Sequence, residues 1–325
     1  MKKIKIAIVG GSGLVGENIV KVLKDECILD FSEVTLYVSK NSAGKKINYF
    51  GEVYDLVLLD ENSLKEKYDI VFFSAGDDVS KNWAERFSEN GAFVIDNSNA
   101  FRKEKNVPLI VPEINIEKVN KNTKIISNPN CSTIQLTLAT KCLLEFAKSQ
   151  NTNLEKIVVS TYQSVSGAGR LALFDLENET NLKIKEPIKN NVLLKIGDIE
   201  DNDFCKEENK IMFELCKILD EKISVCASTV RVPISHCHSE SVYAKFSKNV
   251  DFSQINGFFD KEYLSLQRDI VLPTDVYGKN KTYICRLRKF SECETTFFVI
   301  ADNLLRGASY NAVLIAKYII FNLLT

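Results

Sequence analysis

The chain has 325 residues, with 42 basic and 43 acidic side chains and a net charge of -1. This balance provides no broad basic surface of the kind that binds nucleic acid or an anionic membrane, and the length suits two domains with separate cores. The nine cysteines form no CxxC pair, and neither a signal segment nor a membrane-length apolar run occurs, so we expect a protein of the reducing cytoplasm.

The first third of the chain alternates short apolar strands with helical segments. We expect strands at residues 4–9, 34–38, 70–74 and 93–96, and helices at 14–23 and 83–90. This alternation predicts a doubly wound parallel sheet. The first strand-to-helix connection is GGSGLVG at residues 10–16, whose glycines allow the backbone to approach a pyrophosphate at a helix N-terminus. Because its spacing is not GxGxxG, a simple turn that needs positive φ is the alternative.

The end of the second strand indicates which dinucleotide is bound. Ser39 and Lys40, followed by Asn41 and Ser42, stand where an NAD-binding fold carries a carboxylate for the ribose 2′-hydroxyl. A hydroxyl and a cation at this point suit a 2′-phosphate, so we expect NADP in preference to NAD.

Cys131 is the candidate nucleophile. It stands in NPNCST, residues 128–133, directly before an apolar helical run at 134–147. The unpaired N–H groups and the dipole of a helix N-terminus favour a thiolate. The alternative is a small buried hydrophobe, which we expect for most of the other cysteines. The only two histidines, His236 and His238, are candidate proton partners; metal binding by this pair is an alternative, but no further ligand cluster accompanies them.

The second half of the chain has longer strands with alternating faces. We expect strands at residues 154–160, 225–231, 241–246, 283–288 and 296–301, and helices near 206–219, 254–260 and 304–324. This pattern predicts a largely antiparallel sheet with one face covered. The sheet is also the expected oligomer surface.

Eight blocks, in this order, closely resemble bacterial aspartate-semialdehyde dehydrogenases between residue 6 and about residue 317. The blocks are GGSGLVG (10–16), FSAG (73–76), DNSNAFR (96–102), VPEIN (111–115), NPNCST (128–133), VSTYQSVSGAG (159–169), HSES (238–241) and DNLLRG (302–307). The resemblance implies an α/β protein with a Rossmann-like dinucleotide-binding domain, residues 1–131 plus 305–325. A catalytic and dimerisation domain of α+β type, with a mostly antiparallel sheet, would comprise residues 132–304.

The same resemblance implies the reaction: NADPH-dependent reductive dephosphorylation of 4-aspartyl phosphate to aspartate 4-semialdehyde, on the route to lysine, threonine and methionine. The implied catalytic residues are Cys131 as nucleophile, His238 as acid–base catalyst and Gln163 as a positioning group. The implied substrate ligands are Arg231 for the α-carboxylate, Glu207 for the amino group, and Arg102, Asn130 and Lys210 for the phosphate. The implied NADP residues are Gly10, Ser12, Gly13, Leu14, Val15, Gly16, Ser39, Lys40, Ser42, Ser74, Gly76, Ser166, Gly167 and Asn303.

Two departures from the family pattern qualify these expectations. Many relatives carry an arginine where this chain has Asn41, so we expect a smaller preference for NADP, and residues 190–203 differ from the usual lead-in to Glu207 and Lys210. We expect small-molecule partners only, no metal, and a homodimer or dimer of dimers. The alternatives are another acyl-phosphate or acyl-CoA reductase of this fold, or a silent nucleotide-binding relative, which should have lost the cysteine, histidine or arginine.

Overall fold

The computed structural model describes residues 3–324, which divide into two compact units. The first runs to Pro129 and resumes at Ala308, and the second comprises Asn130–Gly307. The domain boundaries expected from the sequence, after residue 131 and before residue 305, differ from these by two or three residues. In the described part of the chain, no helix is both long enough and apolar enough to cross a membrane.

The first unit is built on a seven-stranded sheet with the order β3-β4-β2-β1-β5-β6-β7. The strands are β1 Ile4–Val9, β2 Ser32–Val38, β3 Lys46–Tyr49, β4 Glu52–Leu58, β5 Ile70–Phe73, β6 Phe93–Asp96 and β7 Ile125–Ser127. All neighbouring strands pair in parallel except β3 and β4. The doubly wound sheet predicted from the alternating pattern is therefore confirmed.

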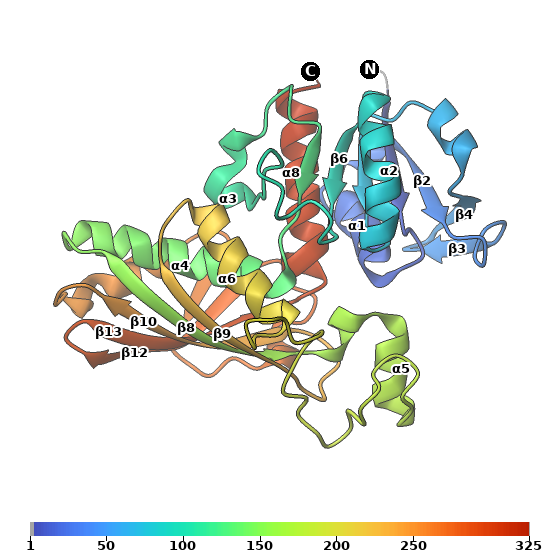
Figure 1. The fold of residues 1–325 in the computed structure, drawn as a ribbon. Helices are drawn as coiled ribbons and strands as arrows, with labels where there is room; N and C mark the ends of the chain where they lie inside the picture. The colour runs from blue at the N-terminus through green and yellow to red at the C-terminus, as the bar shows by residue number, and fades with distance from the viewer. Residues whose placement is uncertain (1–2, 325) are drawn as a thin grey trace. The chain divides into compact units, whose positions relative to one another are not determined.

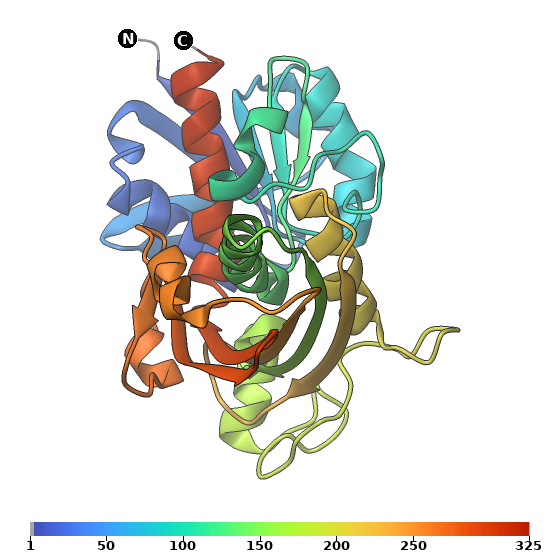
Figure 2. The same cartoon turned by 90° about the vertical axis from the view of Figure 1, so that its left-hand side faces the viewer.

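Helices cover both faces of this sheet. They are α1 Leu14–Asp25, α2 Asp77–Glu89, α3 Pro112–Asn115 and α8 Tyr310–Asn322, with 3₁₀ turns at Leu29–Phe31, Glu61–Lys65 and Ile116–Lys118. α1 and α8 pack together on one face, and α2 lies on the other (Figure 1, Figure 2). Strand β1 lies between β2 and β5, so the chain winds away from it in both directions, and the carboxyl ends of β1 and β5 form the topological switch point of the sheet.

The second unit contains a six-stranded sheet with the order β11-β12-β13-β10-β8-β9. The strands are β8 Leu154–Gln163, β9 Ser224–Arg231, β10 His238–Phe246, β11 Leu264–Gln267, β12 Thr282–Ser291 and β13 Glu294–Ala301. Its central pairs are antiparallel, whereas the pairs at the two edges, β11 with β12 and β8 with β9, are parallel.

One face of this sheet is covered by helices (Figure 1). The helices of the unit are α4 Cys131–Ser149, α5 Arg170–Asn178, α6 Lys206–Leu219 and α7 Pro273–Val276, with 3₁₀ turns at Val165–Ala168 and Phe252–Phe259. α4 and α6 pack on the sheet. Along β10 the burial alternates residue by residue, so His238, Glu240 and Val242 share the covered face.

Several expected helices have different limits or geometry. α2 begins at Asp77, six residues before the expected start, because its first turn is polar and carries no apolar periodicity. Residues 252–259 form 3₁₀ turns where we expected a helix at 254–260. The expected helix at 304–324 is divided into a π-helical turn at Leu305–Ser309 and α8, which begins at Tyr310.

Candidate active site

Cys131 is the first residue of α4, as its sequence context predicts. The preceding residue, Asn130, caps the helix: its Oδ1 accepts hydrogen bonds from the backbone N–H groups of Ser132 at 2.9 Å and Thr133 at 3.3 Å. The cap fixes the first turn and leaves the partly exposed thiol at the positive end of a 19-residue helix. Gly307 lies against it, since a Cβ there would be 3.0 Å from the Cys131 Cβ.

Glu207 connects three of the predicted site residues. Its Oε1 accepts hydrogen bonds from Asn130 Nδ2 at 2.8 Å and Gln163 Nε2 at 3.2 Å, and its Oε2 pairs with Lys210 Nζ at 3.2 Å. Burial alone would raise the pKa of Glu207, but the Lys210 charge, the Asn130 hydrogen bond and the Arg231 charge lower it. Glu207 is thus an ionised carboxylate that contacts side chains from the start of α4, from α6 and from β8.

His238, the first residue of β10, is a neutral imidazole with a defined tautomer. The Ser164 backbone N–H donates to its Nδ1 at 3.0 Å, so the ring proton must be on Nε2. Burial, reinforced by the positive charge of Arg231, lowers the pKa of His238 to about 3. No hydrogen-bond partner reaches Nε2 within the described residues. His238 therefore presents a proton donor, and at neutral pH it is not positioned to accept a proton.

Arg231 ends β9 and lies beside both the histidine and the cysteine. One guanidinium nitrogen donates to the Ser164 carbonyl oxygen at 2.7 Å. Burial lowers the pKa of Arg231, while the charges of Glu207 and Cys131 oppose that shift. A Cβ on Gly167 would lie 3.2 Å from Arg231 Nη1 and 3.4 Å from His238 Nε2. Glycine at this position therefore keeps open the space between the guanidinium and the imidazole.

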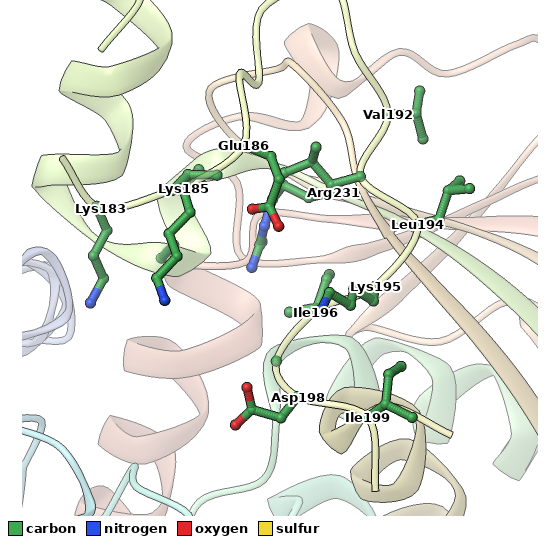
Figure 3. A pocket seen from close by; sticks show the side chains of 14 residues that line it. Lys183, Lys185, Glu186, Val192, Leu194, Lys195, Ile196, Asp198, Ile199 and Arg231 are labelled. Atoms are coloured by element: carbon green, nitrogen blue, oxygen red, sulfur yellow. The ribbon is translucent and has the colours of Figure 1, made fainter. Parts of the chain in front are cut away.

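A pocket of about 690 Å³ adjoins Arg231. Arg231 contributes to its wall from β9, and most of the remaining wall comes from residues 183–186 and 192–199 (Figure 3). The wall includes most of the segment 190–203 that differs from the family pattern. Asp175 secures the beginning of this wall, because it accepts hydrogen bonds from Thr180 Oγ1 and from the backbone N–H groups of residues 182, 183 and 184.

Asn303, Ser164 and Ser166 form a hydrogen-bond cluster behind His238. Asn303 Oδ1 accepts from both serine hydroxyls, at 3.1 and 3.2 Å, and from the Cys237 backbone N–H at 3.0 Å. Ser166, Gly167 and Asn303, which we expected to contact the cofactor, belong to the second unit. The other expected cofactor residues belong to the first.

The glycine-rich loop in the first unit has the close packing that a nucleotide site requires. Gly10 has φ of 88°, and a Cβ there would lie 2.7 Å from the Ser74 carbonyl oxygen. A Cβ on Gly16 would lie 2.6 Å from the Gly10 carbonyl oxygen. Ser74 is tied to β1 by its backbone N–H and its hydroxyl, which both donate to the Val9 carbonyl oxygen. The loop after β1 is thus packed against the loop after β5, at the crevice where doubly wound sheets bind nucleotides.

The remaining expected ligands of the first unit lie in loops. Ser39 and Lys40 are exposed after β2, and a turn closes behind them through a hydrogen bond from the Ser42 N–H to the Ser39 carbonyl oxygen at 3.0 Å. Arg102 is buried and donates to Asn99 Oδ1 at 3.1 Å and to the Asn97 carbonyl oxygen at 2.7 Å.

The second histidine lies outside the site. His236 precedes β10, and its ring packs on Tyr277 with centroids 4.5 Å apart. Between the histidines, Cys237 has φ of 69°, so the pair does not share one face of a strand. Within residues 3–324 no group of three or more histidine, cysteine or acidic side chains is arranged to hold a metal.

The structure adds residues that sequence reasoning missed. Glu214 accepts the Asn130 backbone N–H at 2.7 Å, and Gln135 Nε2 donates to the His238 carbonyl oxygen at 3.4 Å. The spacing of residues 207, 210 and 214 on one face of α6 is a signal that would have included Glu214. The Ser164 backbone donor leaves no such signal in the sequence.

Comparison with known proteins first identifies the class of protein. Residues 5–122 match the model of the semialdehyde dehydrogenase NAD binding domain, and residues 146–306 match that of the semialdehyde dehydrogenase dimerisation domain. The chain is therefore a two-domain oxidoreductase of the semialdehyde dehydrogenase class with an NAD(P)-binding domain, and its second domain indicates a homo-oligomer.

Similar proteins define the family within this class. Aspartate-semialdehyde dehydrogenase of Aquifex aeolicus is 36% identical, covering 97% of this chain and 98% of its own, and that of Bacillus subtilis is 35% identical with 96% of both covered. The crystal structure of aspartate semialdehyde dehydrogenase II from Vibrio cholerae, complexed with ASA, has a TM-score of 0.92 at 32% identity and covers 99% of this chain. The chain belongs to the aspartate-semialdehyde dehydrogenase family.

Proposed function

We propose that this chain catalyses the reversible NADP-dependent reductive dephosphorylation of 4-aspartyl phosphate to L-aspartate 4-semialdehyde, through a thioacyl intermediate on Cys131. The observation that supports it best is the placement of Cys131 at the start of α4, with Arg231, His238 and Glu207 buried around it. The reaction would serve lysine, threonine and methionine synthesis in the cytoplasm.

The first chemical step needs a thiolate. The N-terminus of α4 and the nearby guanidinium of Arg231 both favour negative charge on the Cys131 sulfur. The thiolate attacks the acyl carbon, the carbon–oxygen bond to phosphate breaks, and inorganic phosphate leaves with the bonding electron pair. His238 does not act as the base for this thiol, because its Nδ1 already accepts a hydrogen bond and its Nε2 already carries a proton.

His238 instead begins as a donor toward the oxygen of the reacting carbonyl. Its Nε2–H stabilises negative charge that develops on this oxygen during attack. NADPH, when bound, supplies the hydride that reduces the thioester. Hydride addition leaves a negatively charged thiohemiacetal oxygen; its electron pair re-forms the carbonyl as the carbon–sulfur bond breaks, and the sulfur leaves as the thiolate. The His238 Nε2–H stabilises this oxygen by hydrogen bonding and transfers no proton, because an imidazole with a pKa of about 3 is a weak base at neutral pH.

The charged groups around the thiol suit an amino-acid substrate. The planar guanidinium of Arg231 matches a carboxylate in a bidentate pair. Glu207 provides the negative charge for an ammonium group, with Gln163 and Asn130 holding its carboxylate in place. Lys210, together with Asn130 and Arg102, would bind the phosphate.

The loops after β1, β2 and β5 fit a dinucleotide. Gly10, Gly16 and Ser74 allow the backbone to approach a pyrophosphate, and Gly13 caps α1 behind it. Ser39 and Lys40 would contact the 2′-phosphate, so NADP is preferred to NAD. The roles of Ser12, Leu14, Val15, Ser42 and Gly76 in lining this site belong to the same proposal.

The test is a phosphate-dependent reduction of NADP⁺ by L-aspartate 4-semialdehyde. Turnover should require inorganic phosphate and should stop when phosphate is omitted. Turnover that requires coenzyme A in place of phosphate would indicate an acyl-CoA reductase of the same fold. Binding of NADP without turnover of this aldehyde would indicate a silent homologue.

A further inference from the structure

Glu240 is a buried carboxyl group that the proposed reaction does not use. It is fully buried on β10, two residues after His238 and on the same covered face of the sheet. Neither of its oxygens has a hydrogen-bond partner within the described residues. An ionised carboxylate without a partner in such surroundings would carry a large desolvation cost. Burial accordingly raises the pKa of Glu240 well above its usual value, with the Gln135 amide opposing the shift.

Gln135 provides the complementary group. It is fully buried on α4, one helical turn after Cys131, and its Nε2 donates to the His238 carbonyl oxygen at 3.4 Å. Its Oε1 has no hydrogen-bond partner within residues 3–324. The interior beneath the active site thus places the Glu240 carboxyl beside the Gln135 amide, whose oxygen has no donor within the described residues.

A single proton on Glu240 satisfies both groups, because a protonated carboxyl is a donor as well as an acceptor. The other neighbours of Glu240 in the sheet provide no better partner. Directly opposite it are Val299, which is apolar, and Thr161, whose hydroxyl reaches neither carboxyl oxygen of Glu240.

We propose that Glu240 is a neutral carboxylic acid that donates to Gln135 Oε1 and so holds the Gln135 amide on the His238 backbone. Glu240 is then a positioning residue for His238, and it acts through an amide on the helix that carries Cys131. This inference deepens the proposed function, because it rests on the role assigned there to His238.

The principal test compares Glu240→Gln with Glu240→Leu. The glutamine amide retains a donor of the same size, so kcat should remain within about threefold of the wild type. Leucine leaves the Gln135 oxygen buried and unsatisfied, so kcat should fall roughly tenfold to a hundredfold with KM nearly unchanged. A Leu variant with wild-type kcat, or a Gln variant as impaired as the Leu variant, would overturn the proposal. If Glu240→Leu does not fold, Gln135→Met removes the same link from its other end and should give the same loss of kcat.

Two measurements report on the site without turnover. The chain has only two histidines, so nitrogen-15 NMR of the imidazoles, assigned with His236→Gln, shows the His238 tautomer directly. The Nε2–H tautomer should persist in Glu240→Gln and become mixed or shifted in Glu240→Leu; identical His238 signals in both variants would contradict the positioning role.

Infrared difference spectra of the wild type against Glu240→Gln should contain a protonated carboxyl band at pH 7. A carboxylate band in its place would refute the neutral acid. Both the NMR and the infrared measurements can be interpreted even if aspartate semialdehyde is not the substrate.

Discussion

Cys131 differs from the other cysteines in its electrostatic surroundings. Cys142 and Cys237 are buried, which raises the pKa of each thiol to about 12. Cys131 is partly exposed at a capped helix N-terminus and lies near a guanidinium group. Reactivity toward electrophiles follows thiolate character and access, so these differences should be measurable.

We predict that Cys131→Ala abolishes turnover in both directions while NADP binding remains, because no thioester can form and the glycine-rich loop is untouched. Electrophile labelling at pH 7 should modify Cys131 before any other cysteine. Cys293→Ala is the matched control, since Cys293 is also partly exposed but lies between β12 and β13. Near-normal rates in the Cys131 variant would disprove the thioacyl mechanism.

His238 should matter far more than His236 for the rate. Replacing His238 by Asn should lower kcat by roughly a hundredfold to a thousandfold, the usual cost of removing a donor to a developing oxyanion. His236→Asn should have a small effect, because that ring packs on Tyr277 outside the hydrogen-bond network. Steady-state kinetics of the two variants provides the comparison, and small, equal effects would show that both histidines are structural.

The low pKa of His238 also predicts how stability depends on pH. The folded pKa of about 3 lies below the usual value of 6.5, so between these values the unfolded chain binds a proton that the folded chain does not. Stability from this residue is therefore fully present above pH 6.5 and is lost as the pH falls toward 3. Its contribution should approach about 1.4 kcal/mol per pH unit. Urea unfolding from pH 7 to 5 should show a steeper loss for the wild type than for His238→Asn; parallel curves would mean that His238 is protonated in the fold.

At the scale of elements, we predict that the loop after β2 determines the preference between NADP and NAD. Lys40 is exposed, so its pairing with a 2′-phosphate should contribute about 1 kcal/mol, as for other exposed ion pairs. Lys40→Ala should therefore reduce the ratio of kcat/KM for NADP over NAD by roughly fivefold. Lys46→Ala is the control, because that exposed lysine pairs with Asp55 on β4 at 3.4 Å. A wild type that prefers NAD, or an unchanged ratio in Lys40→Ala, would remove Lys40 from the cofactor site.

Elements with strong periodicity could be predicted from the sequence almost to the residue, as β1, β6 and α6 show. β3 and β4 were missed because they lie at the sheet edge, where β4 is largely exposed and lacks clean alternation. β7 was missed because it has only three residues. Local patterns cannot reveal strands whose apolar residues do not mark one face.

The sequence indicated individual residues of the candidate site, but not which of them contact one another. Helix-start context pointed to Cys131, and the rarity of histidine pointed to His236 and His238, of which the family resemblance selected His238. The tautomer of His238 was not predictable, because it depends on a backbone N–H that is 74 residues away in the chain. Glu207, Asn130 and Gln163 also meet only through folding, since no short-range pattern links residues 44 and 77 positions apart.

At the scale of the whole molecule, we propose that two copies associate through the uncovered face of the second sheet. Val158 and Tyr162 lie on this face, 37% and 39% exposed, on the strand that also carries Gln163. Exposed apolar side chains in the middle of a sheet face indicate an interface. The match of this region to a dimerisation domain agrees with that assignment.

We predict that Tyr162→Asp weakens self-association, because the interface would then contain a buried charge without a partner. Sedimentation velocity over a range of concentrations should show a shift toward monomer. Phe50→Asp is the control, since Phe50 is similarly exposed at 41% but belongs to the first unit. An unchanged mass for Tyr162→Asp would place the interface elsewhere.

The discontinuity of the first unit has a consequence for how the protein is made. Its α8 comes from the last residues of the chain, and Asn311 of that helix donates to the Ile110 carbonyl oxygen and to Asn128 Oδ1. During synthesis the amino-terminal sheet therefore emerges first but lacks this helix until the whole second unit has been made. The second unit is continuous and can fold earlier, since domains generally fold as units while the chain is made. A ribosome that stalls after the second unit but before α8 would thus hold a chain whose first unit is unfinished although its second unit is complete.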